Sequence, residues 1–187
     1  MKNLIRIGIG CGLIIAFGFA SGQPGEADLP KDQKTAVKIH FTFTSTYCGD
    51  DAPAQQLLDE LARPKPLAGQ PVFVKRGEVN NPDDNTFIFS GTSGDIGEVN
   101  IVVPPGKYYV VFDNKKTRDL YEEYRSKYTT QTEFYTALDP SCLSEWIKTP
   151  ELTFEVRSGY PQELTINKEI LCPWTVPCCE YTKRIAK

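Results

Sequence analysis

The amino-acid sequence predicts an all-β fold, an antiparallel β-sandwich of seven strands with an α-helical insertion. Seven short segments alternate apolar and polar residues, which is the period of a strand buried on one face. Segments rich in Gly, Pro and Asn separate them, as expected for strands joined by turns. With 187 residues, 40% of them hydrophobic, the chain is long enough to bury a core without needing disulfides.

The clearest strand covers residues 37–43, where apolar side chains occupy every odd position and polar ones every even position. The other six strands are predicted from shorter alternations of the same kind. The inward-facing residues of the seven strands are Val37, Ile39, Phe41 and Phe43; Val72 and Val74; Phe87 and Phe89; Val99, Ile101 and Val103; Tyr108, Val110 and Phe112; Leu152, Phe154 and Val156; and Leu164 and Ile166.

Residues 1–22 are predicted to be a signal peptide. Lys2 and Arg6 precede fourteen apolar or small residues, 7–20, and a polar stretch follows at once. A membrane span needs roughly 20 apolar residues, so this run is too short to anchor the protein. We therefore expect export to an extracytoplasmic location (periplasmic, cell-surface or secreted) and no transmembrane span in the mature chain.

Cleavage of this leader is expected after Ala20 or Gly22, where small residues stand. Cys11 raises the alternative of a lipoprotein, but apolar residues continue for nine positions beyond it, so lipidation is not favoured.

The rest of the chain is expected to divide into three parts. Residues 23–35 lack apolar periodicity and predict a flexible leader. Residues 36–171 form the β-sandwich domain, with the helical insertion at about 117–148, and residues 172–187 form a Cys-rich C-terminal tail.

Two segments interrupt the β pattern with helical spacing. Residues 51–62 place three leucines on one stripe, with Asp50 or Asp51 available as the N-cap and Pro53 in the first turn. In the insertion, Asp139 followed by Pro140 predicts the start of a further helix. The apolar residues at helical spacing are Leu57, Leu58 and Leu61 in the first segment, and Leu120, Tyr121, Tyr124, Tyr128, Cys142, Leu143, Trp146 and Ile147 in the insertion.

The tyrosines of the insertion, Tyr121, Tyr124, Tyr128 and Tyr135, allow two interpretations. They could present aromatic rings to a glycan or a protein, but at helical spacing we favour packing of the insertion against the sandwich.

Residues 66–112 carry a family resemblance. They read PLAGQPVFVKRG and, after a loop, GTSGDIGEVNIVVPPGKYYVVF. The order and spacing of these elements resemble those of the carboxypeptidase-regulatory-like and Cna-B-like domains, which are prealbumin-like (transthyretin-like) β-sandwiches. The resemblance implies a prealbumin-like arrangement of the seven strands.

The structural turn of this segment is Pro104, Pro105 and Gly106. Pro105 presets φ for the first corner and Gly106 accepts a positive φ at the second. We therefore expect residues 99–103 to fold back onto 108–112 as a hairpin, with Tyr108 packed inward.

Two activities of these families are not supported. The hydroxyisourate hydrolases carry several histidines and a C-terminal Tyr-Arg-Gly-Ser, whereas this chain has only His40 and ends in RIAK. A Lys–Asn isopeptide crosslink would need Lys38, Asn167 and a carboxylate such as Asp113, but the lysine and the asparagine fall on the polar phase of their strands and should face solvent.

Five cysteines follow the leader: Cys48, Cys142, Cys172, Cys178 and Cys179. An oxidising compartment predicts two structural disulfides and one leftover thiol. A bridge from Cys172 to Cys178 or Cys179 would fix the tail, with Cys48 and Cys142 as partners for each other or for the remaining tail cysteine. The adjacent Cys178 and Cys179 are expected to pair with different partners rather than with each other, and the sequence leaves the connectivity open.

A metal or redox role for the cysteines is less favoured. Their spacings do not match a zinc site, and there is no C-x-x-C motif. The oxygen-rich segment 80–85 likewise lacks the ligand spacing of a calcium loop and reads as a solvated turn.

Composition excludes further classes. Lys and Arg total 21 against 24 Asp and Glu, so no basic excess favours nucleic acid as a partner. A single histidine and a single methionine argue against haem, copper or a His-based triad, and we expect no cofactor.

The sequence therefore favours a non-catalytic binding or structural module whose partner is an unknown protein or glycan at the cell envelope. The alternatives are an extracytoplasmic thiol-redox or metal-handling protein using the C-terminal cysteines, and a hydrolase using His40.

Overall fold

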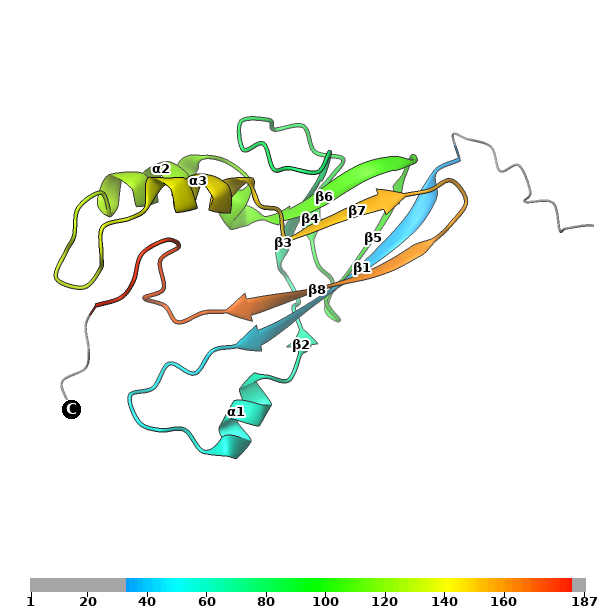
Figure 1. Cartoon of the computed structure of the whole chain (residues 1–187). Coiled ribbons are helices and arrows are strands. Elements are labelled where there is room, and N and C mark those ends of the chain that lie inside the picture. Colours follow the sequence, from blue (N-terminus) through cyan, green and yellow to red (C-terminus); the bar gives the residue numbers. More distant parts are fainter. Residues whose placement is uncertain (1–32, 183–187) are drawn as a thin grey trace, which may run out of the picture.

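Two β-sheets packed face to face form the body of the protein, and a helical insertion extends from one end (Figure 1). The computed structural model describes residues 33–182, so the predicted signal peptide and most of the predicted leader lie outside the described residues. The elements in chain order are β1 (Thr35–Ser45), α1 (Gln55–Leu61), β2 (Lys65–Pro66), β3 (Pro71–Arg76), β4 (Phe89–Thr92), β5 (Glu98–Val103), β6 (Gly106–Phe112), the 3-10 helix η1 (Asp113–Lys115), α2 (Asp119–Lys127), α3 (Pro140–Lys148), β7 (Leu152–Val156) and β8 (Gln162–Ile170). The predicted β-sandwich with a helical insertion is confirmed, with eight strands rather than seven.

The first sheet is built around β1. On one side β1 pairs with β8 along nine positions, from Val37 opposite Gln162 to Ser45 opposite Ile170, and this pair is parallel. On the other side it pairs antiparallel with β5 and then with the short β2. The prediction of antiparallel strands throughout is therefore wrong for β1 and β8. These strands are joined through the whole domain, so no short turn forces them to run in opposite directions.

The second sheet has the order β4-β3-β6-β7 and is antiparallel throughout. Its strand β6 is buried on both faces. Tyr108 and Val110 face the sandwich core, whereas Tyr109 and Val111 pack on the outer face against Phe73. Phe87 covers this outer cluster and lies outside β4, although its alternation with Phe89 predicts a strand.

The predicted hairpin between residues 99–103 and 108–112 does not form. Strand β5 pairs with β1 and β6 with β3 and β7, so the Pro104–Gly106 segment carries the chain from one sheet to the other. The two prolines lack the N–H groups that would close a hairpin. Gly106 adopts φ +152°, and the Tyr108 hydroxyl donates a hydrogen bond to the Pro104 carbonyl at 2.6 Å.

Helix α1 is shorter than predicted. It begins at Gln55 rather than residue 51, and its N-cap is Ala54 without a side-chain hydrogen bond, so neither aspartate caps it. Pro53 lies before the helix. Leu57 and Leu58 are 40% and 37% exposed. None of the described helices is long and apolar enough to cross a membrane.

The insertion has a hydrophobic core of its own. Helix α3 begins at Pro140 after the Asp139 N-cap, as predicted, and α2 contains Tyr121 and Tyr124. The core joins Tyr128 and Leu138 to Leu143 of α3 and to Val176 of the tail. The tyrosines thus pack as expected, but against the helices and the tail and not against the sandwich.

Replacing Tyr108 by Phe tests the turn between the sheets. The substitution removes only the hydroxyl that bonds the Pro104 carbonyl, and we expect the free energy of unfolding to fall by about 1 kcal/mol. Urea unfolding followed by circular dichroism measures the change. Tyr160→Phe, at a tyrosine that is 53% exposed, is the matched control and should leave the midpoint unchanged. Equal effects of the two substitutions would contradict this role of the hydroxyl.

Candidate functional site

Two disulfides attach the C-terminal tail to the rest of the protein. Cys48 pairs with Cys172, with their Cα atoms 5.6 Å apart, and Cys142 pairs with Cys178 at 5.7 Å. The expected bridge within the tail is absent, since Cys172 and Cys178 each reach a different element. Ser45 and Ile170 are register partners in the parallel β1–β8 pair, so the segments that follow them bring Cys48 and Cys172 together.

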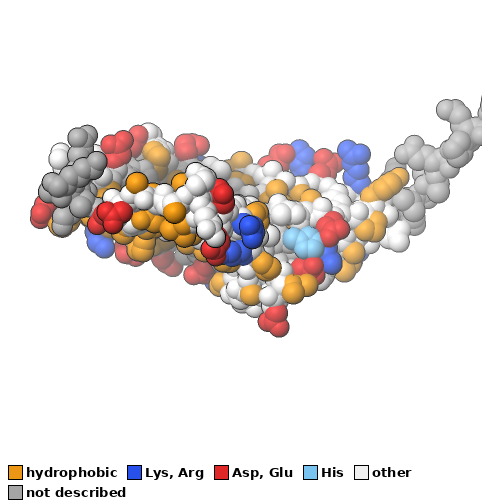
Figure 2. Space-filling model, turned by 90° about the horizontal axis from the view of Figure 1, so that it is seen from below, with side chains coloured by type: hydrophobic (Ala, Val, Ile, Leu, Met, Phe, Trp, Pro, Cys, Tyr) orange, Lys and Arg blue, Asp and Glu red, His pale blue; other side chains and the backbone are white. Residues whose placement is uncertain are grey.

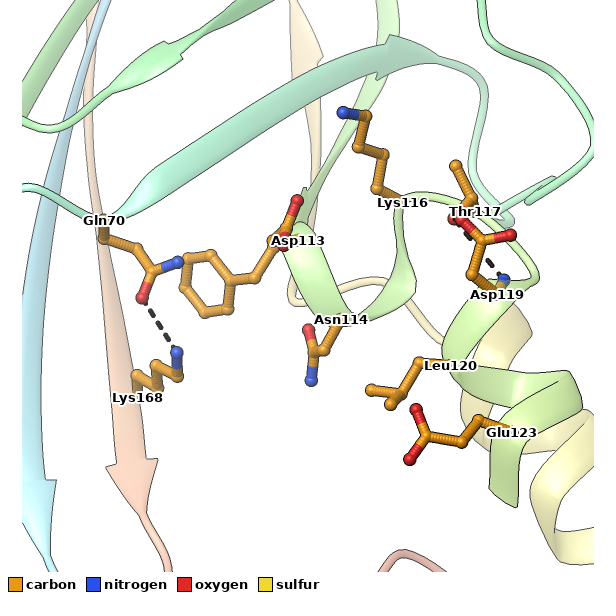
Figure 3. A pocket seen from close by; sticks show the side chains of 10 residues that line it. Gln70, Asp113, Asn114, Lys116, Thr117, Asp119, Leu120, Glu123 and Lys168 are labelled. Carbon is orange, nitrogen blue, oxygen red and sulfur yellow. Dashed lines mark hydrogen bonds between the residues drawn. The ribbon is translucent and has the colours of Figure 1, made fainter. Parts of the chain in front are cut away.

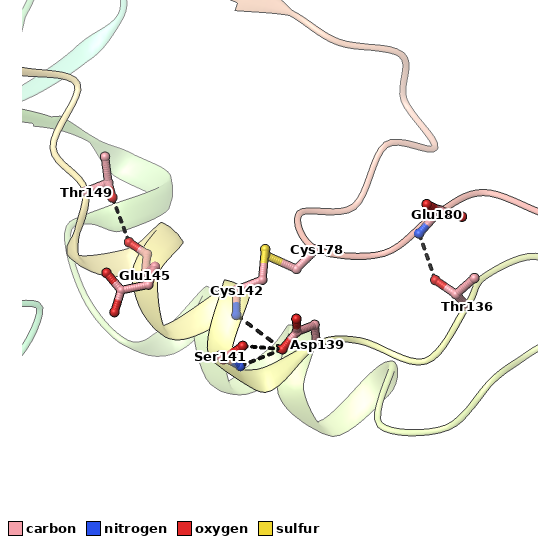
Figure 4. The surroundings of a disulfide bond; sticks show 8 residues. All are labelled: Thr136, Asp139, Ser141, Cys142, Glu145, Thr149, Cys178 and Glu180. Carbon is pink, nitrogen blue, oxygen red and sulfur yellow. Dashed lines mark hydrogen bonds between the residues drawn. A yellow bond between two sulfur atoms is a disulfide. The ribbon is translucent and has the colours of Figure 1, made fainter.

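The second disulfide fixes the tail along the insertion (Figure 4). Asp139 caps α3 by accepting hydrogen bonds from the Ser141 hydroxyl and from the Cys142 and Ser141 backbone N–H groups, and these bonds hold the pKa of its carboxyl below the ordinary value. Farther along the tail, the Thr136 N–H donates to the Glu180 carbonyl at 3.0 Å, and the Glu180 N–H donates to the Thr136 hydroxyl at 2.9 Å. The tail is thus held by both a covalent bond and backbone hydrogen bonds.

Cys179 is the free cysteine of the described residues. It follows Cys178 directly and packs at the edge of the insertion core. Burial raises the pKa of its thiol, so less of it is thiolate near neutral pH.

Four aromatic residues form a surface cluster at the tail, here called the aromatic patch: Phe134, Tyr135, Trp174 and Tyr181. The Tyr181 ring is central, with its centroid 5.4 Å from that of Tyr135 and 5.9 Å from that of Trp174. Trp174 is 37% exposed and Tyr181 39% exposed. Figure 2, a view of the molecule from below, shows hydrophobic side chains gathered toward the end that carries the tail.

A cleft of about 540 Å³ lies between the sandwich and the insertion (Figure 3). Its lining comes from β8, α2, Gln70 just before β3 and the segment around η1. Lys168 of β8 is half-buried there; its ammonium donates to Gln70 Oε1 at 2.8 Å and lies 4.8 Å from the centroid of the Phe112 ring. Burial lowers the pKa of Lys168, although the Glu151 carboxylate opposes this shift.

His40 lies on the outer face of the first sheet and has acidic neighbours on both sides. Its Nδ1 is 3.1 Å from Glu98 Oε1, and its Nε2 contacts Glu163 Oε1. Both ring nitrogens are thus occupied by carboxylates on adjacent strands, and neither is left to activate a nucleophile. This arrangement gives the hydrolase alternative no support.

The oxygen-rich segment 80–85 is organised by a lysine. Lys75 of β3 is 1% exposed, and its ammonium donates to the backbone carbonyls of Asn81 and Asp84 at 2.9 and 2.5 Å. Burial lowers its pKa. The side-chain cation thus occupies the inner side of the loop, where carbonyl oxygens would otherwise be free to bind a metal ion. No group of three or more potential metal ligands occurs among residues 33–182.

Lys38 and Asn167, two of the three residues considered for an isopeptide bond, each have a different side-chain partner. Lys38 pairs with Glu98 at 3.3 Å, while the Asn167 amide donates to the Thr44 hydroxyl at 3.0 Å. Asp113 begins η1 at the end of the other sheet. The expectation that Lys38 and Asn167 point away from the core is met.

Sequence reasoning missed the roles of Lys168 and Lys75. The signal for Lys168 was available, because it continues the inward phase of Leu164 and Ile166 on one strand. Lys75 gave no such signal, since its position on β3 reads as an outward-facing polar residue. Lys75 is buried only because the loop that follows β3 folds over it.

Lys75→Met tests how the loop is held. The substitution leaves two inward-facing carbonyls without their donor, and we expect the free energy of unfolding to drop by about 1–3 kcal/mol, with faster amide hydrogen exchange in residues 77–88. The control is Lys65→Met, at a lysine 45% exposed and paired with Glu60, which should change stability by less than about 0.5 kcal/mol. Unchanged exchange in the loop of Lys75→Met would contradict the assignment.

No family model and no curated protein matches this chain. Among solved structures it is similar to the minor pilin GBS52 of Streptococcus agalactiae, with 13% identity over 78% of this chain and 48% of that chain and a TM-score of 0.37. It is also similar to the shaft pilin SpaA of Lactobacillus rhamnosus GG, with 11% identity over 75% of this chain and 52% of that chain and a TM-score of 0.36. The chain spans about half the length of each. The likeness is loose, and neither fold nor function is inferred from it.

Proposed function

We propose that this protein is an exported, non-catalytic module that binds a protein at the cell envelope through the aromatic patch. The observation that carries the proposal is the double attachment of the tail, with Cys172 joined to Cys48 and Cys178 joined to Cys142. Disulfides of this kind persist in oxidising compartments outside the cytoplasm. They hold the patch rigidly in place, which lowers the entropy cost of binding.

The exposed residues of the tail and of the two positions before it favour a protein over a glycan. Trp and Tyr are the side chains most often found at the centre of protein interfaces. Ile170 and Leu171, which precede Trp174 in the chain, are 41% and 50% exposed. Aliphatic side chains add buried apolar area against a protein, whereas the hydroxyl-rich edge of a sugar needs polar partners.

Thiol-redox chemistry is the second candidate function. The supporting observation is that the Cys179 thiol stands next to Cys178, whose sulfur is bonded to Cys142. Exchange would let the Cys179 thiolate attack this disulfide, forming a Cys179 bridge and releasing a thiolate on Cys142 or Cys178. The raised pKa of Cys179 weighs against this function, since the thiolate is the nucleophile.

Counting thiols separates these two functions. The purified exported protein, unfolded without reductant, should react with one equivalent of a thiol reagent per chain. After reduction, a chain cleaved after residue 20 or 22 should react with five. Three or more reactive thiols before reduction would overturn the structural role of the disulfides. Peptide mapping should then find Cys48 linked to Cys172 and Cys142 linked to Cys178.

Site-specific crosslinking tests the protein partner. With p-benzoylphenylalanine in place of Trp174, irradiation of intact cells should yield a discrete protein adduct that mass spectrometry identifies. The same group in place of Ile96, an exposed apolar residue in the turn between β4 and β5 that is 66% exposed, is the control and should not yield this adduct. Identical adducts at both positions, or binding to a glycan array that Trp174→Ala abolishes, would contradict the proposal.

A further inference from the structure

We propose that helix α1 of one molecule docks into an apolar pocket on the insertion of a second copy of this chain. The pocket lies between the loop that follows β3 and helices α2 and α3. Neither surface includes a residue of the aromatic patch, so this proposal stands or falls independently of the proposed function.

Helix α1 has an apolar stripe that the described chain leaves uncovered. Leu57 and Leu58 are exposed and Leu61 is half-buried, and none of the three belongs to a hydrophobic cluster of residues 33–182. Leu61 follows the other two by four and three residues, so all three share one side of the helix. The helix has seven residues, none of them buried, and no side-chain cap. A helix this short is marginal in water, so a partner that covers the stripe would stabilise it.

The pocket on the insertion offers apolar walls to such a stripe. Its volume is about 250 Å³, and the walls are Val79 and Pro82 of the loop, Tyr121 of α2 and Ile147 of α3. This volume lies below the range of about 300–1,000 Å³ that is typical of small-molecule sites. The pocket therefore suits apolar side chains that project from a neighbouring protein, as the anchor residues of protein interfaces do.

The charges of the two surfaces are opposite. The charged residues that line the pocket are Arg118 and Lys148, and both are cationic. Arg118 is paired with Asp83, whereas no carboxylate of the described residues lies within 4.0 Å of the Lys148 ammonium. Residues 50–61 carry four carboxylates and no Lys or Arg. Docking thus brings an acidic segment to a pocket whose rim carries an unpaired cation.

The carboxylates of α1 are accessible to a partner. Asp59 accepts a hydrogen bond from Gln55 at 2.7 Å, and Glu60 pairs with Lys65 at 3.5 Å. Both contacts lie on exposed surface, where an ion pair contributes little, and each uses one of the two carboxylate oxygens. Asp59 and Glu60 therefore keep an oxygen for the Lys148 ammonium of a second copy.

The two surfaces lie on different parts of the molecule. In Figure 1, α1 lies at the bottom near β2, whereas α2 and α3 lie at the upper left. The helix therefore does not occupy the pocket of its own chain, and docking joins two molecules. Because the contact pairs two different surfaces, a dimer still has one unoccupied pocket and one undocked α1, and association continues until a ring closes.

Sedimentation velocity of the purified exported protein, with both disulfides formed, tests the association. We expect the weight-average sedimentation coefficient to rise as the protein concentration increases from about 10 μM to 1 mM, because a small interface is weak. Added salt should shift this rise to higher concentration, because it screens the attraction between the acidic segment and Lys148.

Two variants separate the helix from the pocket. The double substitution Leu57→Ser and Leu58→Ser removes the stripe, and Ser144→Glu places a larger, anionic side chain among the pocket-lining residues. Each variant alone should associate at least about tenfold more weakly than the natural sequence. An equimolar mixture of the two should form a 1:1 heterodimer and no larger species, because each variant supplies the surface that the other lacks. Lys148→Glu, at an exposed residue, is a second pocket variant with the same expected effect.

Each variant has a matched control. Ile96→Ser removes an exposed apolar side chain from the turn between β4 and β5, and Ser126→Glu adds a carboxylate to α2 at a residue outside the pocket lining. Both should associate like the natural sequence, and circular dichroism should show that all variants keep the fold. Trp174→Ala should also leave the association unchanged, which separates this contact from the aromatic patch.

Three results would overturn the proposal. The first is a protein that stays monomeric at 1 mM. The second is a mixture of the folded stripe and pocket variants that yields no heterodimer. The third is an association that Trp174→Ala abolishes, which would assign self-association to the aromatic patch.

Discussion

The parallel pairing of β1 with β8 is the constraint on which the other features depend. It makes β1 the central strand of the first sheet, with β5 and β2 on the side away from β8. Its register brings Cys48 to Cys172 and carries the tail toward the insertion. It also sets Glu163 beside His40 and turns Lys168 toward Gln70. A slip of one residue would reverse every side chain of β8 and remove these contacts together.

The insertion also depends on the tail for part of its hydrophobic core. Its core is small, and Val176 of the tail is one of its buried members. Helices of nine residues such as α2 and α3 are marginal by themselves in water, so their stability comes from packing. The disulfide between Cys142 and Cys178 keeps this part of the core in place. The helices and the tail therefore form one cooperative unit beside the sandwich.

Local patterns in the sequence predicted local structure well. Alternation along residues 37–43 and the Asp139-Pro140 cap depend on neighbouring residues, and both predictions are confirmed. The hairpin at Pro104–Gly106 failed because strand pairing depends on which sheet each strand joins, and a turn sequence does not encode that choice. The Cys48–Cys172 pair was missed for the same reason, since it follows from the pairing of strands more than a hundred residues apart. The cleft could not be predicted from local patterns either, because its walls come from β8 and α2, which are distant in the sequence.

The same β1–β8 pair gives the molecule a direction along which it resists pulling. The chain enters β1 at Thr35 and leaves β8 at Ile170, and because the strands are parallel these two points lie at opposite ends of the pair. Tension between them loads all the interstrand hydrogen bonds in shear at once, instead of opening them one after another. Beyond the strands, the Cys48–Cys172 bond closes a segment with a sequence separation of 124, so the chain within it cannot be drawn out. Load between these two points therefore passes through the β1–β8 pair, and the Cys48–Cys172 bond limits how far the chain between its two cysteines can be extended.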